Sequence, residues 1–359
     1  MKKNNKAILI ILMIMVLSLT GCTKNLKDAD GKIVVNEKTG QTLPANIMCA
    51  PTDEDNLKLY KETKEALEEK YSKQLEAGDI SKKEYEKKVK KIVNVDDLVA
   101  CKDFKVTSGG YEGIWNSIFI KPLTWLILKI GMLVKNYGLA IIIATLLIRA
   151  LMYPITLKTA KQSENMKLAN PELQKIEKKY SGKNDQDSMM KKSTEVMQVY
   201  KKYGINPLSG CLFSFLQIPL FFAFYESLYR LPALFEDKFI GFMMSTSPIK
   251  GMGMNHWLYL ILPVLVALTT FFSFKLNSGA SLNPDQEKSM KYTMIFLMVM
   301  IVFMSFSMST AIIIYWITNS TFTIIQNLIV KKGKRNPDVI LTKKSKKSTD
   351  LVVSKRSKK

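Results

Sequence analysis

The residue that most needs a chemical explanation is Arg149, which lies inside the apolar run YGLAIIIATLLIRALMYPITL from Tyr137 to Leu157. A helix over this run is about 30 Å long, which is roughly the thickness of the hydrocarbon core of a bilayer. An arginine at the centre of such a helix costs roughly 2.5 to 3.5 kcal/mol on insertion scales, so water or polar side chains must meet it. Four of the 53 basic residues are arginines, so arginine is not the default cation of this chain.

Further polar residues recur in other apolar runs at a similar expected depth. One stripe lies on a single helix face between Ala311 and Val330, and it consists of Trp316, Asn319, Ser320, Thr323 and Asn327. Two other runs contribute Gln217, Thr270 and Ser273. We expect these side chains and Arg149 to line a water-containing groove that is open to the cytoplasm and closed on the outer side by Trp316 and Tyr315. The alternative for Ser, Thr and Asn is that they hydrogen-bond neighbouring helices together.

The composition predicts the elements that would carry these residues. The 359-residue chain is 47% hydrophobic with a formal net charge of +22, and its apolar residues are gathered into runs. This pattern is typical of a polytopic membrane protein. The fold class that we predict is an all-α membrane protein with five transmembrane helices, at about 137–157, 208–230, 256–275, 292–308 and 311–330. An interfacial amphipathic helix is expected at 114–134, because Lys121, Pro122 and Lys129 interrupt that apolar run.

The charges of the connecting segments predict the orientation. Residues 158–207 hold 11 lysines and six acidic residues, and the last 29 residues hold 12 Lys or Arg and two Asp. The positive-inside rule places both segments in the cytoplasm and the loop 231–255 outside. Apolar stripes on either side of Ser181-Gly182 predict a helical hairpin at 158–207 within a core at 135–331. Residues 332–359 form a basic cytoplasmic tail.

The N-terminus carries the features of an exported protein. A basic start and a short apolar core predict a signal peptide at 1–21, and the sequence LTGC resembles a bacterial lipobox with lipidation at Cys22. The alternative is an uncleaved anchor. Cleavage would place residues 22–113, an extracellular Lys/Glu-rich helical segment, on the outer face of the bacterial cytoplasmic membrane. A disulfide between Cys49 and Cys101 could persist there, and free thiols are the open alternative.

The residue types argue against covalent chemistry. The chain has one histidine and no CxxC pair, which leaves little material for a zinc site. It also has no glycine-rich phosphate-binding loop and no evident pair of nucleophile and base. We therefore expect a protein that is not an enzyme and that uses no metal or cofactor.

Three segments taken together resemble a known family. They are LLIRALMYPIT around Arg149, YGINPLSGCLFSFLQIPLFFAFY after the charged hairpin, and YWITNSTFTIIQ before the basic tail. Their order is similar to that in the YidC/Oxa/Alb family of membrane protein insertases, in particular the lipoprotein-type YidC of Gram-positive bacteria. The resemblance covers about Trp115 to Lys332.

The resemblance implies a five-helix core with a hydrophilic groove open to the cytoplasm and to lipid. It implies that Arg149 is the groove arginine and that Gln217 and Trp316 lie on helices that line the groove. The partners implied are nascent membrane proteins and, through the basic tail, the ribosome. The Sec translocon and anionic lipids are further candidate partners. A lipid scramblase and a small-solute transporter remain the alternatives, although the five spans show no matching halves of the transporter kind.

Overall fold

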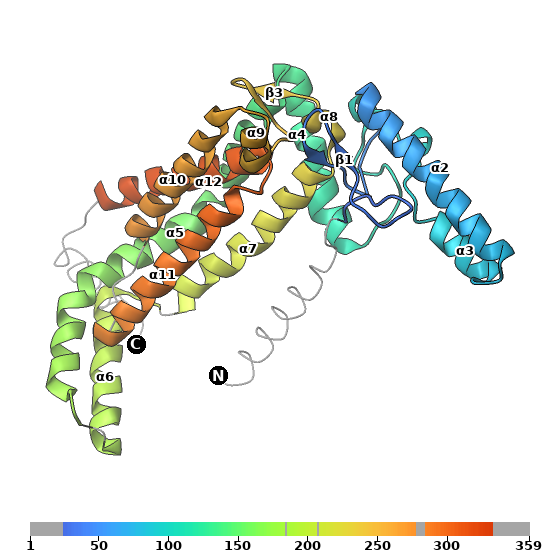
Figure 1. Cartoon of the computed structure of the whole chain (residues 1–359). Coiled ribbons are helices and arrows are strands. Elements are labelled where there is room, and N and C mark those ends of the chain that lie inside the picture. Colours follow the sequence, from blue (N-terminus) through green and yellow to red (C-terminus); the bar gives the residue numbers. More distant parts are fainter. Residues whose placement is uncertain (1–23, 184, 207, 278–283, 333–359) are drawn as a thin grey trace, which may run out of the picture. The chain divides into compact units, whose positions relative to one another are not determined.

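The computed structural model describes residues 24–183, 185–206, 208–277 and 284–332 (Figure 1). The predicted signal peptide, Cys22 and the basic tail beyond Lys332 lie outside the described residues. The chain divides into two compact units. The first comprises residues 1–148, 217–266 and 302–319, and the second comprises 149–216, 267–301 and 320–359. Several helices contribute residues to both units, and each unit is described by itself.

Helices make up most of the described residues (Figure 1). The longer ones are α2 Glu54–Glu76, α3 Lys82–Val89, α4 Lys121–Val134, α5 Tyr137–Tyr180, α6 Gln186–Tyr203, α7 Leu208–Tyr229, α10 Ile261–Asn277, α11 Pro284–Ser305 and α12 Thr310–Lys332. The short elements are α8 Pro232–Phe235, α9 Pro248–Gly253, and two antiparallel pairs, β1 Val35–Asn36 with β2 Gln41–Thr42 and β3 Lys238–Phe239 with β4 Phe242–Met243. The predicted class of helical polytopic membrane protein is confirmed.

The number of spans stays a prediction. Within the described residues, four helical stretches are long and apolar enough to cross a membrane, and they are Asn116–Val134, Tyr137–Tyr180, Trp257–Leu276 and Thr310–Lys332. A shorter apolar stretch covers Lys291–Ser305. The first of the four is the segment that we expect to lie in the interface, so its length would also permit a crossing.

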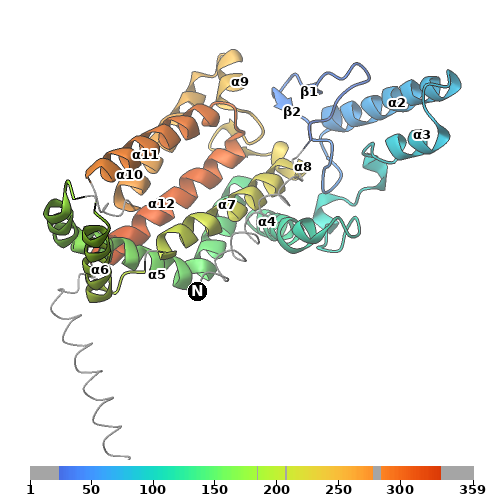
Figure 2. The same cartoon turned by 90° about the horizontal axis from the view of Figure 1, so that it is seen from below.

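The N-terminal segment of the first unit, residues 24–113, is built around α2 and α3, which lie side by side in both views (Figure 1, Figure 2). Asp53 caps α2 by accepting a hydrogen bond from the backbone N–H of Asn56. Ser81 and Glu84 form a capping box that starts α3. Between the helices, Gly78 has φ of +77°, a conformation that glycine adopts without steric cost. The sequence therefore sets the ends of both helices locally.

The core of the first unit joins this segment to the apolar helices. Ile127 of α4, Ile141 of α5, Phe224 of α7 and Tyr315 of α12 are buried in one cluster that also contains Met48, Cys49, Cys101 and Phe104. Cys49 and Cys101 form a disulfide across a sequence separation of 52 residues. The segment before α4 is thus packed into the first unit rather than attached to it by a linker.

Buried charges strengthen the same junction. Lys121, at the start of α4, donates to the carbonyl oxygens of Ser108 and Gly110 and pairs with Glu112 at 3.2 Å. Arg230, just after α7, pairs with the other Glu112 oxygen at 3.0 Å and donates to the carbonyl of Asn46. We call Glu112, Lys121 and Arg230 the Glu112 cluster. The sequence suggested that Lys121 marks an interfacial surface, but its side chain is 1% exposed and serves as an internal structural cation.

The second unit contains the helical hairpin that was predicted at 158–207. Its first arm is the C-terminal part of α5 and its second arm is α6, which lies beside it (Figure 1). The apolar cluster between the arms includes Leu173, Val199 and Tyr203. Unlike the prediction of a helix ending near Leu157, α5 continues without a break to Tyr180, because the lysines that follow Leu157 are good helix formers.

Candidate functional site

Arg149 is a buried cation on α5 in the second unit. It is 2% exposed, whereas Leu151, two residues further along the helix, is 77% exposed. In a water-soluble protein the opposite distribution is expected, since arginine is rarely buried and leucine usually is. In a bilayer the exposed leucine faces hydrocarbon and the cation faces the protein interior. The burial pattern therefore agrees with a membrane-embedded α5.

Arg149 contacts an aromatic ring of α12. The guanidinium carbon lies 6.0 Å from the centroid of the Phe322 ring, within the range of a cation–π interaction. Such a contact is worth about 2 kcal/mol when it is desolvated. This contact brings Arg149 to the helix that carries the predicted polar stripe.

The polar stripe of α12 is turned inward. Asn319, Ser320, Thr323, Gln326 and Asn327 are buried, whereas Thr321, Ile325, Leu328 and Ile329 are exposed. Trp316, at the start of the stripe, is half-buried. The helix thus presents amides and hydroxyls to the protein and mostly apolar side chains to its surroundings.

A second contact between α5 and α12 lies two helical turns beyond Arg149. The side-chain amide of Gln326 donates to the Thr156 hydroxyl at 2.9 Å, and that hydroxyl donates to the carbonyl of Tyr153 at 3.1 Å. Both side chains are buried. The sequence analysis missed this pair, although Gln326 stands at i+3 from Thr323 and i+7 from Asn319 and so extends the same stripe.

The other expected groove residues divide between the two units. Thr270 is buried on α10 in the second unit, and Ser273 is half-buried one turn further along. Gln217, Trp316 and Asn319 belong to the first unit. There the Trp316 ring meets Phe221 edge to face at 5.3 Å, and Tyr315 stacks on Phe224 at 4.2 Å. In that unit these aromatic residues of α7 and α12 pack against one another.

Within the second unit, Lys167 joins the hairpin to α10. Its ammonium group donates to the carbonyl of Leu276 near the end of α10 at 2.6 Å. Burial lowers the pKa of Lys167, and neighbouring Glu164 opposes that shift. Since the last carbonyls of a helix have no partner within the helix, the lysine satisfies one of them.

Arg149 and its polar neighbours can bind and orient a polar ligand. Arg149 donates hydrogen bonds, and its charge cannot be lost by deprotonation, so it suits a carboxylate or ordered water. In the part of the chain that the structure describes, no group of three His, Cys, Asp or Glu side chains could hold a metal ion. What these residues can do chemically is to attract and hydrate a polar chain segment.

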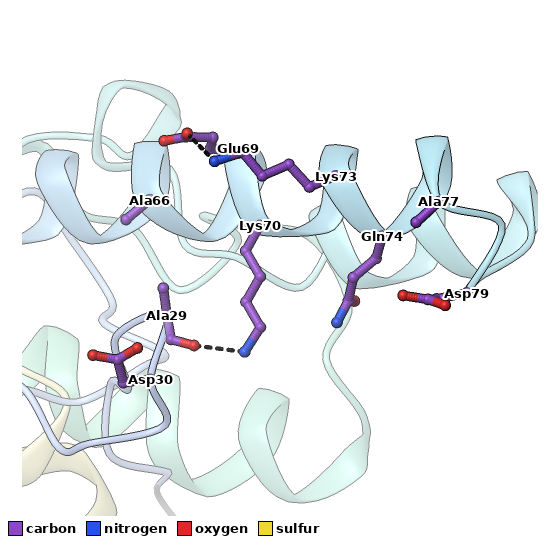
Figure 3. Close-up of a pocket in the computed structure, with 9 residues that line it drawn as sticks. All are labelled: Ala29, Asp30, Ala66, Glu69, Lys70, Lys73, Gln74, Ala77 and Asp79. Carbon is purple, nitrogen blue, oxygen red and sulfur yellow. Dashed lines mark hydrogen bonds and ion pairs between the residues drawn. The ribbon is translucent and has the colours of Figure 1, made fainter.

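A separate cavity of about 710 Å³ lies in the N-terminal segment along α2 (Figure 3). In Figure 3, Lys70 reaches across to the carbonyl of Ala29 at 2.5 Å and Glu69 pairs with Lys73 at 2.7 Å. The ion pair lowers the pKa of Glu69, mainly through the hydrogen bond from Lys73. These contacts leave a shallow surface of mixed charge with no chemical resemblance to the site around Arg149.

A mostly helical membrane protein with a buried cation facing a polar helix face is the class that this fold defines. The family model described as 60Kd inner membrane protein matches residues 129–337, which is more than half of the chain. The chain therefore belongs to the 60Kd inner membrane protein family.

Relatives of known name agree with this assignment. The chain is 36% identical over 226 residues to the membrane protein insertase YidC of Oceanobacillus iheyensis, a match that covers 62% of this chain and 85% of that protein. It is 36% identical to the membrane protein insertase YidC 2 of Bacillus anthracis, covering 61% and 82%. It is 32% identical to the membrane protein insertase MisCA of Bacillus subtilis, again covering 62% and 82%. The family resemblance predicted from the sequence is confirmed.

Proposed function

We propose that this protein is a membrane protein insertase of the bacterial plasma membrane. It receives a nascent membrane protein in a hydrophilic groove open to the cytoplasm and to lipid, and it releases the client's apolar spans sideways into the bilayer. The groove is formed by Arg149, Gln217, Thr270, Ser273, Trp316, Asn319, Ser320 and Thr323, to which we add Thr156 and Gln326. No covalent step is involved.

The physical problem for the client is the polar segment that must cross the membrane. Unsatisfied backbone groups and charges are expensive in hydrocarbon. A groove that contains water halfway across the bilayer shortens the dry distance. Arg149 would attract acidic residues of the crossing segment, since a guanidinium is always charged and donates in a fork that matches a carboxylate.

The single observation that supports this proposal most is the burial of Arg149 beside α12. Its side chain is 2% exposed, while the apolar neighbours on the same helix face outward. A cation kept inside a membrane helix is a functional-site hypothesis by default, because it is costly to insert. The names of the relatives point to the same activity.

The remaining elements complete the proposal. Residues 1–21 are a signal peptide, Cys22 is lipidated, and residues 22–113 lie outside the cell. Residues 158–207 form a cytoplasmic hairpin that receives clients, and the basic tail contacts the ribosome and anionic lipids. Five spans at the predicted positions place the two ends of the chain on opposite sides of the membrane.

The test is insertion of a single-span client with an acidic outer segment in a bacterium depleted of its own insertases. Wild type should restore insertion, and Arg149→Ala should reduce it at least tenfold at equal protein level, since a buried charge-assisted contact is worth about 1.5 to 3 kcal/mol. Arg149→Lys would show whether charge alone suffices. Leu151→Ala is the matched control, because this neighbouring side chain is 77% exposed and away from the groove.

A second client separates attraction from hydration. If its acidic residues are changed to Asn and Gln, Arg149→Ala should affect its insertion much less. Equal loss for both clients would contradict the attraction step, and failure of wild type to insert either client would contradict the insertase proposal.

A further inference from the structure

The loop between α8 and α10 has an unusual surface. From Lys238 to Pro263 the sequence contains no acidic residue, while Lys238 and Lys250 are basic and His256 is the one histidine of the chain. Its large exposed apolar side chains are those of Ile240, Ile249, Met254, Trp257 and Leu258. We call residues 238–260 the outer loop surface. A surface that is both basic and apolar is typical of contact with a lipid interface.

The tip of the β3–β4 hairpin carries an apolar residue in a conformation that disfavours it. Phe239 pairs with Phe242, so Ile240 and Gly241 form a two-residue turn. Their φ angles are +51° and +83°. A turn with two positive φ angles favours Asn-Gly, and a β-branched residue at positive φ is a rare outlier. Since the Ile240 side chain is 79% exposed, its packing inside the protein does not explain its presence.

A cavity of about 230 Å³ lies beside this tip. Its lining includes Lys238, Ile240, Phe242, His256, Leu258 and Tyr259. The Tyr259 hydroxyl accepts a hydrogen bond from the backbone N–H of Met243 at 2.9 Å, so its own proton can still be donated to an anion. One lysine, one histidine and a hydroxyl donor thus line the cavity together with apolar side chains.

The outer loop surface continues into a face that we expect to contact lipid. The stretch Trp257–Leu276, a candidate membrane span, starts within this surface. Exposed apolar side chains follow along α10 at Ile261, Val264 and Leu268. Tryptophan at the end of a span is typical of the membrane–water interface, where the headgroups lie.

We propose that the outer loop surface binds an anionic phospholipid of the outer leaflet. The side chains of Ile240, Trp257 and Leu258 enter the boundary between headgroups and acyl chains. The lipid phosphate occupies the cavity, close to Lys238, His256 and the Tyr259 hydroxyl. The lysines at 238 and 250, with no acidic residue from 238 to 260, favour an anionic lipid over a zwitterionic one, and the apolar rim favours a lipid over free phosphate.

The test uses the full-length protein in vesicles of phosphatidylcholine alone or mixed with phosphatidylglycerol, with one of the two lipids brominated near the headgroup. The chain has four tryptophans, so the Trp257 signal is the difference between wild type and Trp257→Phe. We expect brominated phosphatidylglycerol to quench Trp257 more strongly than brominated phosphatidylcholine at equal bromine content. Lys238→Gln should reduce this preference about fivefold, as expected for one basic residue near an anionic surface.

Two further variants separate binding from folding. Ile240→Asn creates the favoured Asn-Gly turn, so it should keep or raise the melting temperature while weakening Trp257 quenching. Lys87→Gln, an exposed site on α3, is the matched charge control and should change nothing. If Trp257 is not quenched in any vesicle, or if both lipids quench it equally and Lys238→Gln has no effect, the proposal is wrong.

Discussion

The hydrogen bond between Gln326 and Thr156 joins α12 to α5 in the second unit. The Gln326 amide donates to the Thr156 hydroxyl, so loss of Thr156 removes this acceptor from a buried amide, whereas loss of Gln326 leaves the hydroxyl with its bond to the Tyr153 carbonyl. In membrane proteins such side-chain pairs couple by about 0.6 kcal/mol on average and by up to about 1.7 kcal/mol. The pair is therefore a modest contribution to stability with a defined geometry.

A double-mutant cycle measures this pair. We expect Thr156→Val and Gln326→Leu each to lower the free energy of unfolding in detergent, and the double variant to cost less than the sum by about 0.6 to 1.7 kcal/mol. Thr159→Val is the control, because its hydroxyl bonds within its own helix to the carbonyl of Ile155. Strict additivity of the two changes would mean that the pair does not act as a unit.

Single residues differ in how far the sequence alone identifies them. Arg149 is evident because it is a lone charge in a long apolar run. Gln326 was detectable in principle, since it extends the stripe of α12 at helical spacing. The roles of Lys121 and Arg230 were not detectable from the sequence, because Arg230 reaches Glu112 across a separation of 118 residues. Periodicity reports neighbours on one helix, whereas contacts at that separation depend on the tertiary fold.

At the scale of elements, the hairpin of α5 and α6 is stabilised by ion pairs at its rim. The pKa of Glu172 is lowered mainly by the hydrogen bond from Lys202, to which Tyr203 adds a second. The pKa of Glu195 is lowered mainly by Lys179 and then by Tyr180. A carboxyl whose folded pKa is depressed stabilises the fold above its unfolded pKa, and that stabilisation is lost as the pH falls through the folded value.

The hairpin should therefore loosen in acid. As the pH is lowered below the ordinary glutamate pKa of 4.5, the hydrogen-exchange protection of the α6 amides should fall. The comparison is made after the intrinsic exchange rates have been corrected for pH. Glu172→Gln together with Glu195→Gln should flatten this dependence, since amides do not titrate. If the double variant kept the wild-type pH profile, other groups would control the hairpin.

The ends of the elements show which signals are local. Capping by Asp53 and Ser81 and the glycine at position 78 set the ends of α2 and α3, as their sequence indicates. The continuation of α5 past Leu157 was not predicted, because a change from apolar to charged residues marks a membrane boundary and does not end a helix. Pro154 also lies within α5 without ending it.

At the scale of the whole molecule, the N-terminal segment, residues 24–113, is a structural part of the first unit. The Cys49–Cys101 disulfide belongs to its main apolar cluster. The carboxylate of Glu236 accepts hydrogen bonds from the backbone N–H groups of Thr52 and Asp53, both at 2.9 Å. With the Glu112 cluster, these contacts fix the segment to the residues that follow α7. We therefore expect the segment and the apolar helices of this unit to unfold together.

Glu112→Gln tests this expectation, because it leaves the buried Lys121 and Arg230 without a counter-charge in the cluster. Breaking a buried ion pair costs about 3 to 5 kcal/mol, and the 34% exposure of the Glu112 side chain places the cost at or below about 3 kcal/mol. We expect a lower melting temperature in detergent and faster tryptic cleavage of residues 24–113 in the same variant. Glu62→Gln removes an exposed carboxylate on α2 and should change neither measurement. If cleavage rises while the melting temperature is unchanged, the segment unfolds independently of the helices, because a shared core would transmit the loss of the cluster to both.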